Sequence, residues 1–169
     1  QNRREKGKER EKKKELDKEL YPDYVYPEFT PDPGKPFREP IAKLGKKITD
    51  RIPQKLGLKK ITRNDPEYWG LAGVLTDEEA LLALKLGVRK PKTLSEIVKI
   101  SGLEEKKCEA LLEEMSRKGL LEYNWENAAH EKQYVLPMYV PGCAEFFNMN
   151  AKILESNPEM GTFFEHMSR

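Results

Sequence analysis

Cysteine and histidine are scarce in this 169-residue chain, which contains two of each. Cys108 and Cys143 form no CxxC pair, so by themselves they build neither a disulfide framework nor a zinc or iron–sulfur site. His130 and His166 share no metal-ligand spacing with each other or with a cysteine. Glycine-rich phosphate loops and the HExxH and GxSxG motifs are also missing. The sequence therefore predicts no catalytic, metal or cofactor site in this chain.

Long apolar runs are absent as well. No 18 consecutive residues are apolar, so nothing in the sequence has the composition of a membrane span. Hydrophobic residues make up only 37% of the chain and charged residues 36%, which predicts a modest core with poorly buried extensions. The cysteine content requires no oxidising compartment. We expect a cytoplasmic protein that can also lie at the membrane periphery.

Positive and negative charges are unevenly divided along the chain. Residues 1–66 contain 19 Lys and Arg against 12 Asp and Glu, whereas residues 67–169 contain 12 against 17. The leading part is therefore basic and the remainder acidic. A partner attracted by positive charge would meet the leading part first.

The leading part divides into two segments. Residues 1–20 are almost all charged and predict a tail that is helical or disordered, with a basic segment beside an upstream membrane anchor as the alternative. Residues 21–66 begin with six prolines in twenty positions, which exclude a helix there and favour an extended arm. Aromatic residues are interleaved with these prolines at Tyr21, Tyr24, Tyr26, Phe29 and Phe37. We expect them either to pack on their own domain or to bind a protein partner.

The second half of this arm, residues 41–63, is its most basic stretch, with eight Lys and Arg against one acid. Ile41, Leu44 and Ile48 follow a helical spacing and predict a short amphipathic helix that ends before Pro53. Two interpretations stay open. The segment is a solvated arm with its few apolar residues docked, or it contacts an anionic membrane surface or an acidic protein.

From residue 67 the pattern becomes that of a folded helical domain. Thr76 with Glu79, and Thr93 with Glu96, have the spacing of capping boxes at two helix starts. Glycines placed as helix stops follow at Gly87, Gly102 and Gly119. The first of these helices is predicted to bury a face that includes Ala80, Leu81 and Leu84.

A third helix, from about residue 104 to 118, carries one core stripe formed by Cys108, Leu111, Leu112 and Met115. Two short strands, LLEYNW and KQYVLP, then surround the polar loop ENAAHE. The predicted fold is mainly α with a small β-wing: a winged helix-turn-helix domain over residues 67–136, preceded by a long extended arm. Residues 137–169 are predicted to form a C-terminal helical extension of two helices with aromatic faces.

The third helix would enter the major groove in a DNA-binding protein. Its predicted outward face holds Lys106, Glu109, Ala110, Glu113 and Arg117, with Glu114 beside them. The loop adds Glu126 and Glu131 against Lys132 and His130. Such an acidic surface repels the phosphate backbone, so nucleic acid is not the expected partner.

Protein–protein contact is the expected role instead. The predicted partner-binding residues are the arm aromatics and the wing aromatics Tyr123, Trp125 and Tyr134. The alternative is a DNA-binding transcription regulator whose basic arm supplies the phosphate contacts, through Lys46, Lys47, Lys59 and Lys60.

Two residue types in the domain have both a chemical and a structural interpretation. Cys143 lies at a predicted helix start, where a thiolate is stabilised, or it is a small half-buried residue. Cys108 is placed as a core filler. Trp69 and Trp125 are placed as core or cover residues, with stacking on a flavin or nucleotide as the alternative.

The most specific stretches of the domain are EYWGL, EYNWEN and KQYVLPM. Through them, the segment from Pro66 to Arg169 resembles the leading part of ferredoxin-type 4Fe-4S oxidoreductases of strictly anaerobic bacteria. The cluster-binding cysteines of that family are absent here, so no cluster or flavin ligand transfers to any position. The resemblance implies a non-catalytic winged-helix assembly module of an iron–sulfur electron-transfer system. The 4Fe-4S clusters, and in some members a flavin, would then belong to a protein partner or to a downstream region, with this chain as leading part or accessory subunit.

Overall fold

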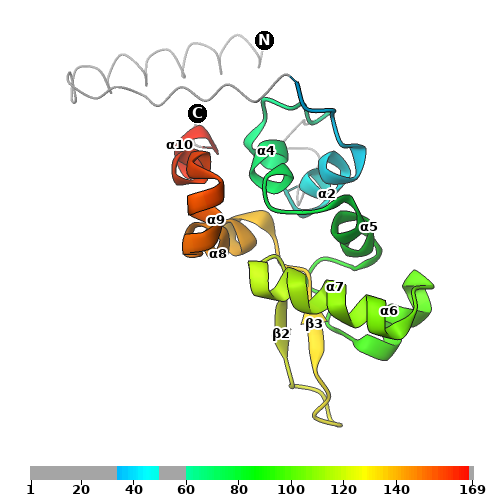
Figure 1. Cartoon of the computed structure of the whole chain (residues 1–169). Coiled ribbons are helices and arrows are strands. Elements are labelled where there is room, and N and C mark those ends of the chain that lie inside the picture. The colour runs from blue at the N-terminus through cyan, green and yellow to red at the C-terminus, as the bar shows by residue number, and fades with distance from the viewer. Residues whose placement is uncertain (1–33, 50–59, 168–169) are drawn as a thin grey trace, which may run out of the picture.

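The computed structural model describes residues 34–49 and 60–167 (Figure 1). The predicted tail, residues 1–20, the first part of the proline-rich segment, residues 21–33, and the stretch 50–59, which includes Pro53 and Lys59, lie outside the described residues. The elements, in chain order, are α2 (Glu39–Thr49), α4 (Pro66–Ala72), α5 (Asp77–Lys85), β1 (Lys92–Thr93), α6 (Leu94–Ser101), α7 (Glu105–Lys118), β2 (Glu122–Asn124), β3 (Gln133–Val135), an irregular turn (Tyr139–Cys143), α8 (Ala144–Asn148), α9 (Ala151–Ser156), the 3-10 helix η2 (Pro158–Thr162) and α10 (Phe163–Met167).

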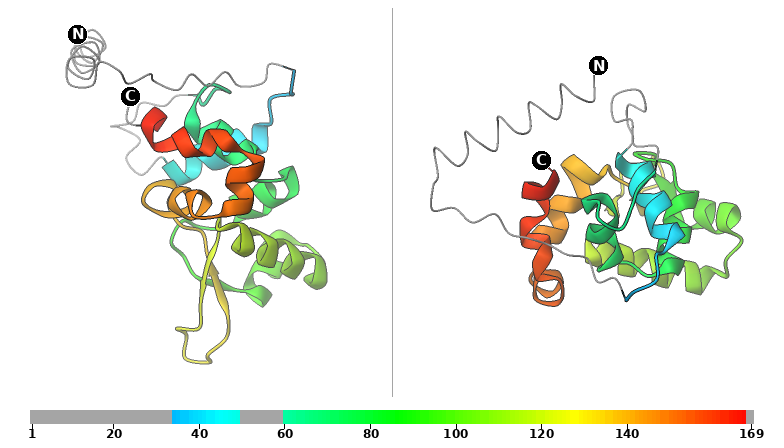
Figure 2. Two further views of the ribbon diagram at one scale, coloured as in Figure 1. Left: turned by 60° about the vertical axis from the view of Figure 1, so that its left-hand side comes forward. Right: turned by 90° about the horizontal axis from the view of Figure 1, so that it is seen from above.

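The described part is mainly helical with a small three-stranded antiparallel sheet in the order β1-β3-β2. Tyr123 of β2 pairs with Tyr134 of β3, and Lys92 of β1 pairs with the other side of Tyr134. The central strand is therefore β3, while β2 lies at an edge. The β2–β3 hairpin projects away from the helices, as two views show (Figures 1 and 2).

Local sequence signals set the helix boundaries around this sheet. Both predicted capping boxes are confirmed, because the Thr76 and Thr93 hydroxyls accept hydrogen bonds from the backbone N–H of Glu79 and Glu96 at 3.2 and 3.4 Å. Gly102 and Gly119 end α6 and α7 with φ of 72° and 94°, the left-handed region that glycine enters without strain. These caps fix the turn between α6 and α7 and the entry into β2.

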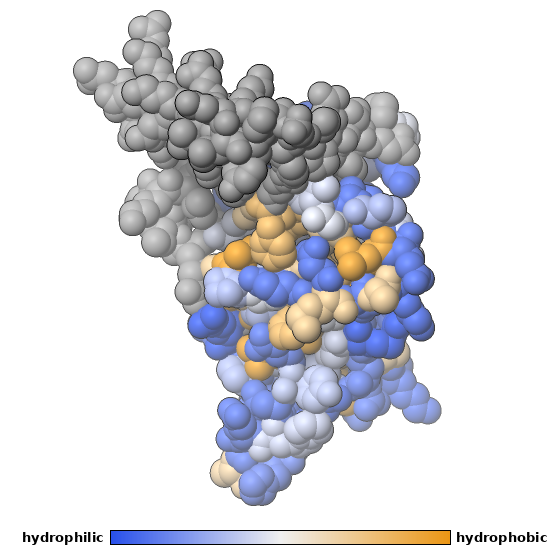
Figure 3. All heavy atoms as spheres, turned by 90° about the vertical axis from the view of Figure 1, so that its left-hand side faces the viewer, coloured by the Kyte–Doolittle hydropathy of each residue, from blue (hydrophilic) through white to orange (hydrophobic). Residues whose placement is uncertain are grey.

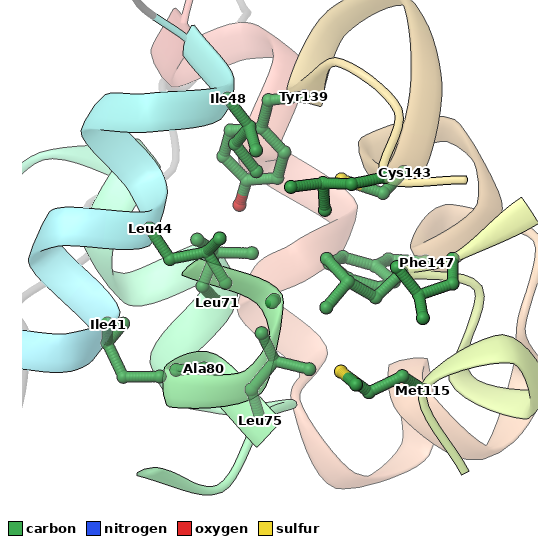
Figure 4. Close-up of a cluster of buried hydrophobic side chains, with 14 of the residues drawn as sticks. Ile41, Leu44, Ile48, Leu71, Leu75, Ala80, Met115, Tyr139, Cys143 and Phe147 are labelled. Atoms are coloured by element: carbon green, nitrogen blue, oxygen red, sulfur yellow. The ribbon is translucent and has the colours of Figure 1, made fainter. Parts of the chain in front are cut away.

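Helix α2 is part of the core, not part of an extended arm. Ile41, Leu44 and Ile48 are fully buried and pack with residues of α4, α5 and the Tyr139 turn (Figure 4). A Cβ at Gly45 would overlap the carbonyl oxygen of Glu67, so glycine lets α2 approach α4 closely. The predicted amphipathic helix is confirmed, and its apolar residues are docked, as one of the two interpretations expects. Because this stripe completes the core, residues 39–49 belong to the folded domain rather than to the predicted extended arm.

Polar contacts hold this segment in place. The Lys47 ammonium donates to the backbone carbonyls of Leu84, at 2.7 Å, and of Leu86 at the end of α5. The Arg38 guanidinium donates to the carbonyls of Ala72 and Leu75 at 2.9 and 2.6 Å. Lys47 and Arg38 therefore satisfy carbonyls at the C-terminal ends of α5 and α4, which favour a positive charge, and Arg38 also binds the Leu75 carbonyl in the loop between these helices.

Helix α5 differs from its prediction at one position. Ala80, Leu82 and Ala83 are buried, whereas Leu81 is 53% exposed and points away from the core. Glu79 is only 2% exposed, and its carboxylate accepts from the Lys118 ammonium at 2.7 and 3.0 Å. This buried ion pair joins the start of α5 to the end of α7.

The C-terminal extension is divided more finely than the two predicted helices. Asn150 interrupts the first, since its side chain accepts from the Ile153 N–H at 3.3 Å and so begins a new helix, α9. Pro158 then begins η2 ahead of α10. Phe147 and Phe163 are buried here and join this extension to the core. Of the helices in the two described ranges, none has the length and apolarity to cross a membrane.

Candidate interaction surface

The outward side of α7 and the β2–β3 hairpin together form one surface, called here the α7–hairpin face. Helix α7 buries Cys108, Leu112 and Met115 and leaves Leu111 half-buried, which confirms the predicted stripe. Its exposed side carries Lys106, Glu109, Ala110, Glu113 and Arg117. The residues predicted to point outward therefore do so.

Basic side chains on the α7–hairpin face are mostly paired with carboxylates of the same chain. Of the three lysines and arginines on this face, Lys106, Arg117 and Lys132, two make such pairs: Arg117 with Glu114 and Lys132 with Glu113. Lys107 and Lys118 of α7 pair with Glu78 and Glu79 of α5. Hydrogen bonds from Arg117 and from Lys132 lower the pKa of the Glu114 and Glu113 carboxyls, respectively. These carboxylates therefore stay ionised at neutral pH, and the basic groups beside them are already neutralised.

Two aromatic residues of the hairpin remain accessible. Tyr123 and Trp125 are 50% and 51% exposed, and their rings meet edge to face at 5.4 Å. The loop that follows is shaped by its own side chains, since Asn124 accepts from the Glu126 N–H at 3.1 Å and Asn127 accepts from the Glu131 N–H at 2.8 Å. The two rings are thus presented on a locally bonded loop.

Tyr134, the third predicted wing aromatic, is instead buried at 3% exposure. It lies on the central strand β3 beneath α7, and its hydroxyl donates to Glu113. Burial, followed by this hydrogen bond, raises the tyrosine pKa. Its ring offers almost no area to a partner, so the assignment of Tyr134 as a partner-binding residue is corrected to a core and positioning role.

A groove runs between α7 and the hairpin. It has a volume of about 420 Å³, and its walls are formed by Ala110, Glu113, Glu114, Ser116, Arg117, Tyr123 and Lys132. Small Ala110 forms part of one wall, Glu113 and Glu114 are paired there with Lys132 and Arg117, and Tyr123 provides an aromatic side. Such a groove suits a side chain that is both cationic and flat.

The predicted arm residues contribute little to this face. Tyr21, Tyr24, Tyr26 and Phe29 lie outside the described residues. Phe37 stacks on Tyr68 of α4 with ring centroids 4.7 Å apart, so it packs on its own domain. Trp69 is buried against Phe163, at 5.8 Å between ring centroids, in the core position that the sequence indicates.

A second exposed group of apolar residues lies on the C-terminal extension: Val140, Phe146, Met149 and Phe164. Figure 3 views the molecule from that side. Hydrophobic residues gather in its upper half, and the end formed by the hairpin is largely hydrophilic. Phe146 packs against Gly119 at the end of α7, whereas Phe164 lies on α10 and provides a control position for the α7–hairpin face.

The two thiols are buried rather than reactive. Cys108 and Cys143 are both 0% exposed, and burial raises the pKa of each thiol. The interpretation of Cys143 as a stabilised thiolate at a helix start is therefore wrong, because α8 is short and the sulfur is enclosed by the core. In the part of the chain that the structure describes, no group of three or more His, Cys, Asp or Glu could hold a metal ion.

Thiol labelling tests this burial. We expect an aromatic disulfide reagent to label neither Cys108 nor Cys143 in the folded protein within the time that it labels a free thiol in solution, because each sulfur is buried and protonated. Both should react at once in denaturant. The labelling rate, measured by absorbance, should follow global unfolding, and rapid labelling of Cys143 under native conditions would contradict the structure.

Glu113 and Lys132 are the functional candidates that sequence reasoning did not combine. Glu113 contacts both the Lys132 ammonium, at 2.6 Å, and the Tyr134 hydroxyl. The sequence contained one indication of this cluster. Lys132 and Tyr134 are two residues apart in the predicted strand KQYVLP, and residues two apart on a strand share a face, so their side chains could be predicted to lie together. The contact with Glu113 depends on how α7 lies across the sheet, which no local pattern contains. Comparisons with protein-family models, curated proteins and solved structures find no match to the chain.

Proposed function

We propose that the chain is a non-catalytic winged-helix module that binds a protein partner through its α7–hairpin face. The order α5, β1, α6, α7, β2, β3, with the sheet order β1-β3-β2 and a projecting hairpin, supports the winged-helix assignment. In this assignment α7 has the position of the helix that reads DNA in related architectures. The charges on that helix support a protein rather than a nucleic acid as partner.

The observation that carries the proposal is the pairing of the basic side chains on this face. Binding to a duplex depends on cations that replace counterions along the phosphates. On this face Arg117 and Lys132 already have a carboxylate partner, and Lys106 is the one remaining cation among its described residues. Exposed Tyr123 and Trp125 have the character of protein-interface residues, which are enriched in aromatics. A protein partner fits both features.

One of the four lysines assigned to phosphate contacts in the leading part already has another role, and another, Lys59, lies outside the described residues. Lys47 is the lysine that caps the end of α5. A phosphate contact would require that cap to break. The transcription-regulator alternative is therefore less well supported than protein binding.

The resemblance of residues 66–169 to the leading part of 4Fe-4S oxidoreductases supplies the kind of partner. We place the module in the cytoplasm, in an iron–sulfur electron-transfer assembly of an anaerobe. The clusters, and a flavin where one is present, belong to that partner or to a region that follows in the same protein. In this assembly the chain positions its partner and carries no electrons itself.

Capture of the partner from an extract of the source organism tests this function. The tagged chain is expected to retain a protein that contains iron, or iron and flavin, measured by a colorimetric iron assay and by flavin fluorescence. A variant with Tyr123→Ala and Trp125→Ala should lose most of this capture, about tenfold or more, because exposed aromatic anchors dominate interface energies.

The matched control is Phe164→Ala, which removes a 39% exposed aromatic from α10, at the other end of the molecule from the hairpin (Figure 1). It should capture the same partner as the unaltered chain. A captured protein free of both cofactors would contradict the electron-transfer assignment. Equal capture by the double variant would contradict the assignment of the face.

A further inference from the structure

One ammonium group on the α7–hairpin face is surrounded in the manner of a cation-binding cage. The Lys132 Nζ lies 2.6 Å from a Glu113 carboxylate oxygen. It also lies 4.5 Å from the ring centroid of Tyr123, 5.2 Å from that of Tyr134 and 6.0 Å from that of Trp125. A carboxylate and three aromatic rings around one cation is the arrangement by which proteins bind ammonium and guanidinium groups.

The cage is built from three separate elements. Glu113 comes from α7, Tyr123 from β2 and Tyr134 from β3, while Trp125 follows β2. The Tyr134 hydroxyl donates to the same Glu113 oxygen that accepts from Lys132, which fixes the carboxylate over the sheet. The register places Tyr123 beside Tyr134, so the two rings face the cation together.

The cage is open to solvent on the side of the groove. Tyr123 and Trp125 are half exposed, and the side chains of Glu113 and Lys132 are 50% and 29% exposed. An ion pair at this exposure contributes little net free energy, because water and salt screen it and a flexible lysine loses entropy in holding it. Lys132 can therefore leave the cage without disturbing the fold beneath it.

We propose that an arginine side chain of the protein partner enters this groove and displaces Lys132 from the cage. This inference rests on the proposed function of the same face and names the chemistry of its ligand. A guanidinium forms two parallel hydrogen bonds with a carboxylate and stacks on aromatic rings, which an ammonium does not do. Glu113 takes the charge, Tyr123 on the groove wall covers the plane, and Ala110 leaves room for the side-chain stem. Trp125 meets the Tyr123 ring edge to face beside the groove.

Charge complementarity favours this occupant over a nucleic acid. Glu114 also lines the groove but is paired with Arg117, so Glu113 is the carboxylate left without a cation when Lys132 swings out. A phosphate would meet this carboxylate, whereas an arginine meets opposite charge. Lys132 acts as a tethered competitor, and removing it should strengthen the binding of an arginine ligand.

The probe is a blocked Gly-Arg-Gly peptide, and the same peptide with citrulline, the neutral isostere of arginine, is its control. Binding is followed by fluorescence, because Trp125 is exposed whereas Trp69 is buried. Lys132→Ala is expected to tighten binding of the arginine peptide about twofold to fivefold, the range of an exposed ion pair. Glu113→Gln should weaken it about tenfold, since the charge-assisted pair is lost while the acceptor for the Tyr134 hydroxyl remains.

Glu105→Gln is the matched control, because it removes the same charge from an exposed position in the first turn of α7. It should leave the affinity unchanged, and thermal melting checks that each variant is folded. Equal binding of the citrulline peptide, an unaltered affinity in Glu113→Gln, or weaker binding in Lys132→Ala would overturn the proposal. If partner capture still depends on Tyr123 and Trp125 in that case, the interaction face stands and only the arginine site is wrong.

Discussion

Replacing Leu44 with alanine is expected to lower the free energy of unfolding by about 2–5 kcal/mol. Leu44 belongs to the most basic stretch of the chain, yet its side chain is fully buried between α2, α4 and α5. Truncation removes apolar contacts and leaves a cavity that rigid neighbouring helices cannot fill. Urea unfolding followed by circular dichroism measures the change.

The neighbouring residue Lys43 is the matched control, since it is exposed on the same helix. Lys43→Ala should change the free energy of unfolding by less than about 0.5 kcal/mol. If Leu44→Ala also left the free energy of unfolding unchanged, α2 would not belong to the cooperatively folding unit. The core of the domain would then not include α2.

The second large effect is expected at the buried ion pair between α5 and α7. Lys118→Ala should lower the free energy of unfolding by about 3–5 kcal/mol, because it leaves the Glu79 carboxylate buried without its cation. Glu79 is held in place by its capping box with Thr76, so it cannot turn out to solvent without breaking that cap as well. Denaturant unfolding measures this loss.

Two controls separate this effect from loss of the lysine stem. Lys118→Met together with Glu79→Gln removes both charges, keeps the volume and the capping acceptor, and should recover most of the lost free energy. Lys107→Ala breaks the exposed ion pair with Glu78 and should lower the free energy of unfolding by no more than about 1 kcal/mol. Similar losses for Lys107→Ala and Lys118→Ala would show that the Glu79 pair is solvated.

Local signals in the sequence predicted the elements of the domain well. The capping boxes at Thr76 and Thr93 and the glycines at 102 and 119 act through hydrogen bonds and dihedral angles within a few residues, so they are readable from the chain alone. The core stripe of α7 is equally local. These features can be predicted without knowing which elements pack against each helix.

Long-range packing explains the errors. The helical spacing of Ile41, Leu44 and Ile48 was visible, but the surrounding lysines suggested a solvated arm. Only the approach of α4 and α5 shows that the stripe is covered and that Lys47 caps another helix. Leu81 is the reverse case, an aliphatic residue in an apolar run that the packing of α5 leaves outside.

The candidate site shows the same division. Aromatic residues in the hairpin predicted a contact surface, but their exposure depends on strand order. Tyr123 and Tyr134 are cross-strand partners, and β2 is an edge strand whereas β3 is central and lies beneath α7. One tyrosine is therefore half exposed and the other buried. The alternation of apolar and polar residues along a strand does not reveal the order of the strands in the sheet. The sequence therefore predicts which aromatic residues lie in the hairpin, but not which of them are exposed.

Titration of a labelled random-sequence DNA duplex tests most directly whether the α7–hairpin face recognises protein rather than nucleic acid. Fluorescence anisotropy at about 50 mM salt, where phosphate contacts are strongest, compares the unaltered chain with a Lys106→Ala and Arg117→Ala double variant. The proposed function predicts identical curves, because Lys106 and Arg117 then face no phosphate. Saturable binding that weakens about tenfold or more in the double variant would place α7 in the groove of DNA and contradict it.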